Sequence, residues 1–188
     1  MSDYTDSLQD HFLIAMPSLD GSYFERSVAY VCDHSSEGAM GLVINHPLDV
    51  MMGEVFEDLK IDVENPYAYK QTVVSGGPVQ PGAGFVLHPS DRMWKHTFQV
   101  SDAISVTTSA DILKDMAKQQ ARPNAFITLG FSGWGPQQLE KEITENSWLT
   151  CPADPEIIFN TPVKDRWKAA LGLMGIEPVQ LSSFVGHA

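Results

Sequence analysis

The segment from Arg26 to Pro47 constrains the fold of this chain more than any other stretch. It contains two runs rich in apolar and β-branched residues, 27–34 and 41–46, which are separated by the short segment 35–38. Two such runs that flank a brief Ser- and Gly-containing segment are typical of a β-hairpin with a longer loop. The sequence therefore predicts an antiparallel pair of strands at this position.

Side chains on a strand point alternately to its two faces. We therefore expect one face of the first strand to carry Val28, Tyr30, Cys32 and His34. Two glycine-rich segments, 75–78 and 130–135, each follow an apolar run that is typical of a strand. We interpret both segments as turns, because glycine permits backbone conformations that other residues avoid, and we expect both to pack against the hairpin.

Length and composition indicate one globular domain, which we expect to span residues 1–188. A chain of 188 residues with 43% hydrophobic residues can bury a substantial core. Its formal net charge of −12 is uneven, since residues 1–66 contain 13 acidic side chains and two strong bases, Arg26 and Lys60. Such an acidic segment repels phosphate backbones, so direct nucleic-acid binding is not expected.

The cysteines and the N-terminal segment indicate in which cellular compartment the protein is expected. Cys32 and Cys151 are too few for the disulfide framework of a small secreted protein. The N-terminal segment is acidic, and its apolar run 12–16 is too short for a signal peptide or a membrane span. We therefore expect a cytoplasmic protein that does not associate with a membrane.

Hydrophobic periodicity predicts the remaining elements. Strands are expected at residues 11–16, 71–75, 84–88, 93–100, 104–107, 125–129 and 156–159. The strand at 84–88 is expected to pair with the strand at 71–75. Helices are expected after Asp49, at 109–122, from Pro136 to Trp148 and at 163–174. Strand pairs interspersed with separate helices indicate the α+β class rather than a regular β-α-β repeat.

Eight short blocks, spread from residue 11 to residue 188, form a specific combination. They are HFLIAMPSL (11–19), FERSVAYVCDH (24–34), GAMGLVINHPL (38–48), GGPV (76–79), GFVLH (84–88), ITLGFSGW (127–134), QLEKEI (138–143) and GHA (186–188). Together these blocks resemble the YqgE/AlgH family of bacterial proteins, and the resemblance covers nearly the whole chain.

The resemblance implies a fold but no reaction. It implies a single α+β domain whose strongly bent, mixed or antiparallel sheet curls toward a partial barrel, with helices packed on its outside. The description of the family as transcriptional regulators names no mechanism. We expect neither a cofactor nor a metal.

Three positions depart from the usual pattern of the family. The family usually has Arg before GFVLH, where this chain has Ala83, and Gly before QLE, where this chain has Gln137. It usually has Arg or Lys between Asn and Pro of the VIN-x-P segment, where this chain has His46. Two of these departures remove a permanent positive charge, so an anion site at those positions would be weaker here.

The polar residues and glycines within the matching blocks are our candidate ligand-binding residues. They are Arg26, His34, Asn45, Gly76, Gly77, His88 and Trp134. The planar guanidinium of Arg26 suits a carboxylate or a phosphate, and the alternative is an internal ion pair with an acid such as Asp33. Glycine N–H groups suit an anion, with tight turns as the alternative use. Trp134 suits either stacking on a planar ligand or packing in the core.

Patterns for catalysis and metal binding are incomplete. The segment around Ser132 resembles the nucleophile elbow G-x-S-x-G, but Trp134 stands in place of the second glycine. Cys32, His34 and His88 lack the paired spacing of a zinc site. The sequence therefore predicts neither a catalytic serine nor a metal centre.

A basic stripe on the helix predicted at 109–122 suggests a DNA-binding face only superficially. Lys114, Lys118 and Arg122 recur at intervals of four residues. Asp111 and Asp115 precede the two lysines by three residues, so ordinary helix ion pairs explain the stripe. We expect this face to be solvated.

Two functions remain open from the sequence. The first is a non-catalytic regulatory or binding protein that recognises a small anionic ligand or a partner protein through the candidate residues. The alternative is a hydrolase that acts on a nucleotide or another phosphorylated metabolite in the same cleft. We prefer the first, because no nucleophile, base and orienting group can be named together.

Overall fold

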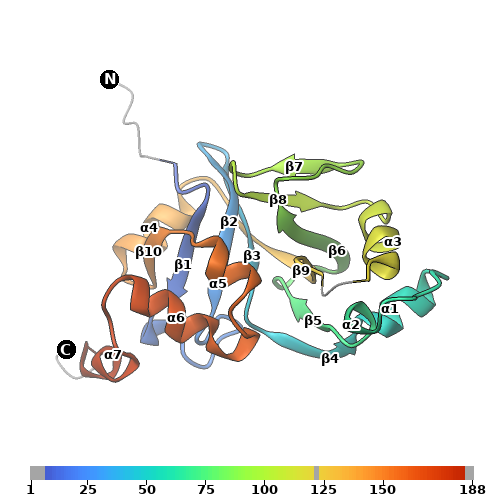
Figure 1. The fold of residues 1–188 in the computed structure, drawn as a ribbon. Coiled ribbons are helices and arrows are strands. Elements are labelled where there is room, and N and C mark those ends of the chain that lie inside the picture. The colour runs from blue at the N-terminus through green and yellow to red at the C-terminus, as the bar shows by residue number, and fades with distance from the viewer. Residues whose placement is uncertain (1–6, 121–122, 185–188) are drawn as a thin grey trace.

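A bent sheet organises the molecule, of which the computed structural model describes residues 7–120 and 123–184 (Figure 1). Within these residues the strands are β1 (His11–Ala15), β2 (Val28–Ser35), β3 (Gly38–Val43), β4 (Pro47–Met51), β5 (Thr72–Ser75), β6 (Val79–Pro89), β7 (Thr97–Gln99), β8 (Ile104–Thr107), β9 (Phe126–Trp134) and β10 (Trp148–Pro152). The helices are α1 (Met52–Asp58), α2 (Pro66–Tyr69), α3 (Asp111–Lys118), α4 (Gln138–Thr144), α5 (Pro155–Phe159), α6 (Arg166–Leu173) and α7 (Pro178–Phe184). Short 3₁₀ turns lie at Pro17–Leu19 and Val163–Asp165.

The sheet is mixed and curls into a half-barrel (Figure 1). Its strands follow the order β10-β1-β2-β3-β9-β6-β8-β7, and each neighbouring pair in this order is antiparallel. β5 lies parallel to β9 and pairs with β4 on its other side. The architecture confirms the predicted α+β class and the predicted bent sheet.

β9 joins the two halves of the sheet because it bends in its middle. Its first half pairs with β5 and β6, and its end pairs with β3. The bend falls at Gly130, whose φ is +76° and where a side chain would overlap the carbonyl oxygen of Gly77. The predicted turn at 130–135 is therefore wrong, because these residues continue the strand through a bend that requires glycine.

The predicted hairpin is present as β2 and β3. β3 begins at Gly38, earlier than expected, so a tight turn joins the strands. A β-bulge at Cys32 shifts the register of the pair, and the extra residue reverses the alternation of side chains beyond it. His34 therefore contacts Glu140 of α4, whereas Tyr30 packs in the cluster beneath α6. The prediction that both share one face is wrong.

Both glycine-rich segments lie against the hairpin, as predicted. The N–H of Val43 in β3 donates to the carbonyl of Gly76 at 2.8 Å. Ala39 and Gly41 of β3 pair with Trp134 and Ser132 of β9.

The C-terminal third differs most from the sequence-based expectation. Residues 156–159 belong to the helix α5 rather than to a strand. Asp154 caps this helix by accepting the N–H of Glu156 at 2.9 Å, and Pro155 occupies the first helical position. The last strand is instead β10, which pairs with β1. The helix predicted to run to Trp148 ends at Thr144.

Other predicted elements also differ in extent or partner. Residues 84–88 belong to β6, which pairs with β8 and β9 rather than with β5. The helix expected after Asp49 begins at Met52, because the preceding residues form β4. Only Thr97–Gln99 of the strand predicted at 93–100 is a strand. Arg122 of the basic stripe and the block 186–188 lie outside the described residues.

Three apolar clusters fill the space on both sides of the sheet. One packs α5 and α6 against β1, β2 and β3, and it includes Tyr30, Leu42 and Leu171. A second packs α4 on the opposite face and includes Val31, Leu139 and Trp148. A third packs α1 and α3 against β5, β6 and β9 and includes Phe56, Val86 and Met116. Burying one such side chain contributes roughly 2 kcal/mol, so these clusters are the main source of stability.

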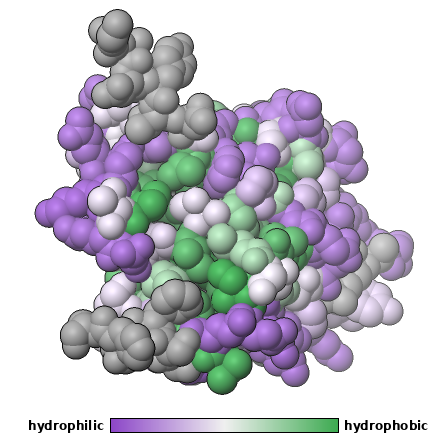
Figure 2. Space-filling model, turned by 90° about the vertical axis from the view of Figure 1, so that its left-hand side faces the viewer, coloured by the Kyte–Doolittle hydropathy of each residue, from purple (hydrophilic) through white to green (hydrophobic). Residues whose placement is uncertain are grey.

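The face that carries α4, α6 and α7 shows apolar residues at its centre with hydrophilic residues around them (Figure 2). Exposed apolar side chains at the end of α6 and on α7 are Leu173, Met174 and Val179. None of the helices within the described ranges has both the length and the apolar character needed to cross a membrane.

Candidate anion-binding site

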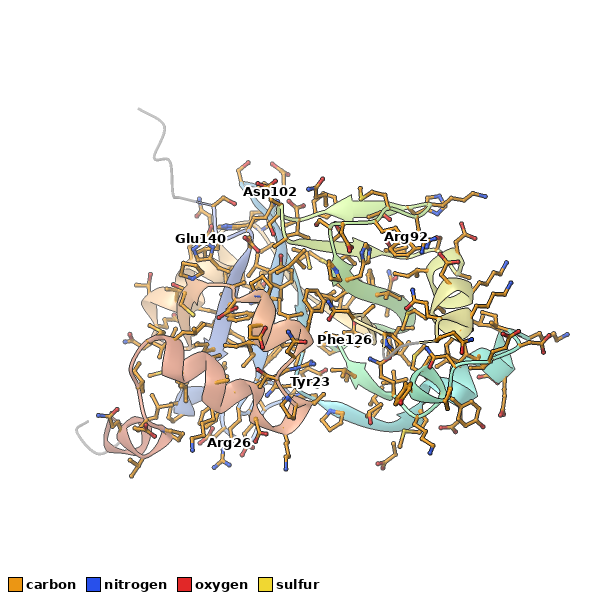
Figure 3. The ribbon with its side chains drawn as sticks, in the orientation of Figure 1. Tyr23, Arg26, Arg92, Asp102, Phe126 and Glu140 are labelled. Carbon is orange, nitrogen blue, oxygen red and sulfur yellow. The ribbon has the colours of Figure 1, made fainter. Side chains whose placement is uncertain are left out.

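The seven residues predicted to bind a ligand lie in different parts of the molecule. Arg26 precedes β2 and His34 lies near the end of β2, and a strand of eight residues is roughly 26 Å long. Figure 3 shows Glu140, the hydrogen-bond partner of His34, near the top of the left half of the molecule and Arg26 near its bottom. The structure therefore does not bring Arg26 and His34 together.

Arg26 and Asn45 organise the entry to the hairpin. The backbone of Arg26 is left-handed (φ +50°), and its carbonyl accepts a hydrogen bond from Asn45 Nδ2 at 2.8 Å. Asn45 Oδ1 accepts the N–H of Val28 at 2.8 Å. The exposed guanidinium of Arg26 lies 5.7 Å from the centre of the Trp167 ring, and it forms no ion pair with a described residue. Asn45 thus has a structural role, and Arg26 faces solvent.

Gly76 and Gly77 lie where two backbones approach each other closely. The N–H of Gly76 donates to the carbonyl of Leu129 at 2.8 Å, so it is not available to a ligand. A Cβ on Gly77, whose φ is +155°, would clash with the carbonyl group of Phe131. These glycines allow the β5–β6 connection to pack on β9.

His34 connects the N-terminal segment to α4. Its Nδ1 accepts the N–H of Leu8 at 2.9 Å, so in the neutral ring Nε2 carries the proton and donates to Glu140 Oε1 at 2.8 Å. Burial alone would raise the pKa of Glu140, but hydrogen bonds from its own backbone N–H and from His34 hold that pKa below its ordinary value. Both ring nitrogens of His34 are therefore occupied within the protein.

His88 and Trp134 are likewise held by internal partners. His88 Nδ1 donates to the carbonyl of Pro89 at 2.8 Å, and Nε2 accepts from Thr107 Oγ1 at 2.7 Å. Burial lowers the pKa of His88, which favours this neutral form. Trp134 Nε1 donates to Glu142 Oε2 at 2.9 Å within the core. The seven candidates therefore do not converge on one cleft.

A different set of residues forms a cavity of about 540 Å³ beside β4 and β5. Its opposite wall is the segment that joins α5 to α6. Lys70, Lys164 and Arg166 line it, and the described lining residues include no aspartate or glutamate. This local excess of positive charge stands against a net charge of −12 for the chain, and it suits a small anion.

Arg166 is the buried cation of this cavity, with 5% of its surface exposed. Its Nε donates to the carbonyl of Thr161 at 3.1 Å and its Nη1 to the carbonyl of Ile44 at 2.5 Å. The guanidinium lies 4.5 Å from the centre of the Phe126 ring. Burial lowers the pKa of Arg166 to about 10, so the side chain still carries its positive charge at neutral pH.

No carboxylate pairs with Arg166 in the part of the chain that the structure describes. A buried cation without a counter-charge is costly, because it loses hydration and gains only neutral partners. Its Nη2 has no hydrogen-bond partner among the same residues. An anion at Nη2 would supply both the missing charge and a charge-assisted hydrogen bond.

Lys70 and Lys164 extend the positive lining toward solvent. Lys70 follows α2 directly, and Lys164 lies in the 3₁₀ turn before α6. Both side chains are exposed, and neither forms an ion pair with a described residue. Their ammonium groups are therefore free to meet an incoming anion.

The sequence contained one signal for this cavity. None of its three cations lies in the blocks that carry the family resemblance, so attention to those blocks misses it. However, Arg166 precedes Ala170 by four residues and therefore lies on the apolar stripe predicted for the last helix. A charged residue on a buried stripe is unusual and indicates a paired or functional charge.

Two smaller cavities have less distinctive linings. One of about 350 Å³ lies between α1, β6 and the start of α3 and is mainly apolar. Another of about 280 Å³ adjoins His88 and contains both Asp91 and Arg92. The described ranges contain no cluster of three or more His, Cys, Asp or Glu that could hold a metal ion.

Comparison with known proteins places the chain in a family. Residues 12–179 match the AlgH-like family. A UPF0301 protein of Vibrio atlanticus is 46% identical over 186 residues, which cover 97% of this chain and 100% of the relative. A UPF0301 protein of Idiomarina loihiensis is 47% identical over 184 residues, with the same coverage.

Two solved structures share the fold. The solution structure of the AlgH protein from Pseudomonas aeruginosa has a TM-score of 0.78 and 39% sequence identity, and the match covers 100% of both chains. A crystal structure of a protein from Corynebacterium diphtheriae has a TM-score of 0.70 at 18% identity and covers 96% of this chain and 92% of that chain, which shows the fold alone. With the family match and the full-length relatives, these findings establish that the chain belongs to the AlgH-like (UPF0301) family.

Proposed function

We propose that the protein is a cytoplasmic, non-catalytic binding protein that takes a small anionic ligand into the cavity around Arg166. The observation that carries this proposal is a buried guanidinium that faces a cavity in which no carboxylate of a described residue balances it. A regulatory role would follow from the occupancy of this cavity, since an anion there contacts β5, α2 and the segment before α6 at once.

The chemistry of the lining favours binding over turnover. Its charged groups are two lysines and one arginine, and the described lining residues include no histidine, cysteine or carboxylate. Histidine, cysteine and carboxylate side chains are the most common nucleophiles and general bases. Cations and backbone-anchored guanidinium groups instead hold an anion in place.

Titration with inorganic phosphate and pyrophosphate, followed by calorimetry and by the melting temperature, tests the proposal. We expect saturable binding, because a ligand that binds the folded state at 100 times its Kd stabilises it by about 2.7 kcal/mol. The double variant Lys70→Gln/Lys164→Gln should weaken binding by roughly 5- to 30-fold, since each exposed contact contributes about 0.5–1 kcal/mol.

A matched control is available on α3. The double variant Lys114→Gln/Lys118→Gln removes the same charge from exposed positions outside the lining of this cavity. Equal weakening by both double variants would show a non-specific effect of net charge and would contradict a site in the cavity. If neither phosphate nor pyrophosphate binds, the proposed site in the cavity is also contradicted.

The alternative function, hydrolysis of a nucleotide or another phosphorylated metabolite, is checked by a separate assay with a nucleotide probe. Release of phosphate from a nucleotide probe at a rate that depends on Lys70 and Lys164 would replace the binding-protein proposal with that alternative. A ligand recovered unchanged after saturation supports binding without turnover.

A further inference from the structure

The helix that carries Arg166 begins in the wall of the cavity. The 3₁₀ turn Val163–Asp165 continues directly into α6, so residues 163–173 form one helical segment. Residues 161–164 line the cavity together with Arg166. In Figure 1 the segment runs from the side of β4 toward α7, so its N-terminal end is directed at the cavity. The positive end of the helix dipole therefore faces a ligand in this cavity.

The first two N–H groups of this helical segment are open. Pro162 occupies the N-cap position without a side-chain hydrogen bond, and neither Val163 nor Lys164 donates its N–H to a described residue. The next two N–H groups donate to the carbonyls of Pro162 and Val163. Asp165, the acid of this turn, is exposed and is not among the lining residues. Open N–H groups at the start of a helix are ready donors for an anion.

Arg166 points to an anion at the same place, independently of the helix start. Its side chain is buried, and two of its nitrogens are held by backbone carbonyls. The unpaired side-chain atoms that are wholly enclosed among the described residues are Gln71 Oε1, Ser109 Oγ and Trp167 Nε1. The unpaired Nη2 of Arg166 is not one of them, so a group in the cavity can reach it.

We propose that these donors bind one dianionic phosphoryl group, which the N–H groups of Val163 and Lys164 and the Nη2 of Arg166 hold by its oxygens. This inference rests on the anion binding proposed above. A phosphoryl group presents three acceptor oxygens and roughly 1.5–2 negative charges at neutral pH, whereas a carboxylate presents two oxygens and a single charge. Three donors and the ammonium groups of Lys70 and Lys164 match the phosphoryl group better.

Three small anions provide the first test, by calorimetry on the unmodified protein. Methyl phosphate presents the dianion, whereas dimethyl phosphate keeps the tetrahedral phosphorus but has fewer acceptor oxygens and a single charge, and acetate is a carboxylate. We expect methyl phosphate to bind at least roughly 10-fold more tightly than dimethyl phosphate or acetate, since each of these loses a charge-assisted hydrogen bond. Equal binding of either would overturn the assignment of a dianionic group.

The N–H of Val163 can be deleted without breaking the helix. Proline is tolerated at the first helical position, provided that the preceding residue is extended. Pro162 is already extended, with φ −53° and ψ 140°. Val163→Pro should therefore fold and bind methyl phosphate at least roughly 10-fold more weakly than Val163→Ala, which changes the same side chain but keeps the N–H.

Nuclear magnetic resonance on the unmodified protein tests the same contact and remains decisive if Val163→Pro does not fold. On saturation with methyl phosphate, the amide protons of Val163 and Lys164 should move downfield, because each gains a hydrogen bond to an anion. The amide protons of β7, at an edge of the sheet, should not move. Saturable binding without a downfield shift at Val163 and Lys164 would overturn this inference.

The outcomes separate this inference from the proposed function. If Lys70→Gln/Lys164→Gln weakens the binding of methyl phosphate, but Val163→Pro and Val163→Ala bind it equally, the helix start is not the site and the anion cavity stands. If no phosphate compound and no acetate binds, both proposals fall.

Phenyl phosphate distinguishes two sources of the phosphoryl group. Tighter binding than that of inorganic phosphate assigns the group to a phosphate monoester, whose body then contacts apolar lining residues such as Val74 and Phe159. Equal or weaker binding assigns it to the free ion. Either result supports the phosphoryl group at the helix start.

Discussion

Removing the carboxylate of Glu142 is expected to destabilise the fold strongly, although this residue lies on a short helix near the surface. Its Oε2 accepts hydrogen bonds from Trp134 Nε1 and from Trp148 Nε1, both at 2.9 Å. The two indoles are 5% and 2% exposed, so Glu142→Ala would leave two buried N–H groups without their acceptor. Each unsatisfied donor costs about 1–3 kcal/mol, which gives a loss of roughly 2–6 kcal/mol for the two.

Urea unfolding followed by tryptophan fluorescence and by circular dichroism measures this loss. The melting temperature should fall by roughly 4–24 °C, because 1 kcal/mol shifts it by about 2–4 °C in a chain of this size. Glu142→Gln keeps an acceptor oxygen and should cost less than the alanine variant. Glu145→Ala, at an exposed position just after the same helix, should cost less than about 1 kcal/mol. If Glu142→Ala and Glu145→Ala lowered the free energy of unfolding equally, the role assigned to the shared carboxylate would be refuted.

Three further predictions concern other parts of the structure. Gly77→Ala should destabilise the protein by more than about 3 kcal/mol in urea unfolding, because its Cβ would clash with Phe131. Gly82→Ala should be nearly neutral, because no heavy atom lies within 4 Å of the new Cβ. Equal losses of stability in the two variants would contradict the close approach of the Gly77 and Phe131 backbones. Because folding holds the pKa of Glu140 below 4.5, the stability that its ionised form contributes is present above pH 4.5 and is lost as the pH falls through the lowered pKa. The stability difference between the wild type and Glu140→Gln, below about 1 kcal/mol at neutral pH, should therefore shrink toward about pH 3, and a difference that does not change with pH would argue against the hydrogen bond to His34. His34→Ala removes the acceptor of the Leu8 amide, so hydrogen exchange at Leu8 should accelerate while exchange in β6 stays unchanged; a general acceleration would indicate global destabilisation instead.

The elements that the sequence predicted well are those whose signals are local. The hairpin at β2 and β3 has two β-branched runs and a short Ser- and Gly-containing connection, and the buried face of α3 follows a 3.6-residue period. Four of its residues are buried as predicted, namely Ile112, Leu113, Met116 and Ala117.

The errors arose where tertiary contacts decide the local conformation. The segment 130–135 has the glycine content of a turn, but pairing with β3 on one side and with β6 on the other keeps it extended. The β-branched residues at 156–159 suggest a strand, but Asp154 and Pro155 begin a helix there. The bulge at Cys32 leaves no clear mark in the sequence, and it reverses the side of the sheet on which His34 lies.

The candidate site was harder to predict than the fold, because its residues come from separate segments that carry no motif. Lys70, Gln71 and Arg166 become neighbours of one cavity only after β5 pairs with β4 and the segment before α6 folds back over them. The position of Arg166 on the apolar stripe of the helix predicted at 163–174 was the one local sign of this arrangement.

The pairing of β1 with β10 has a consequence for how the chain is made. β1 lies between β2 and β10 in the sheet, so it needs partners from both ends of the sequence. At roughly 5–20 residues per second, a ribosome that has produced His11–Ala15 needs several seconds or more before Trp148–Pro152 emerges. During that interval one edge of an almost wholly buried strand is open to pairing with other nascent chains, and contacts of such long sequence separation form slowly. Ribosome-associated chaperones would therefore have their greatest effect on this protein before residue 148 is synthesised.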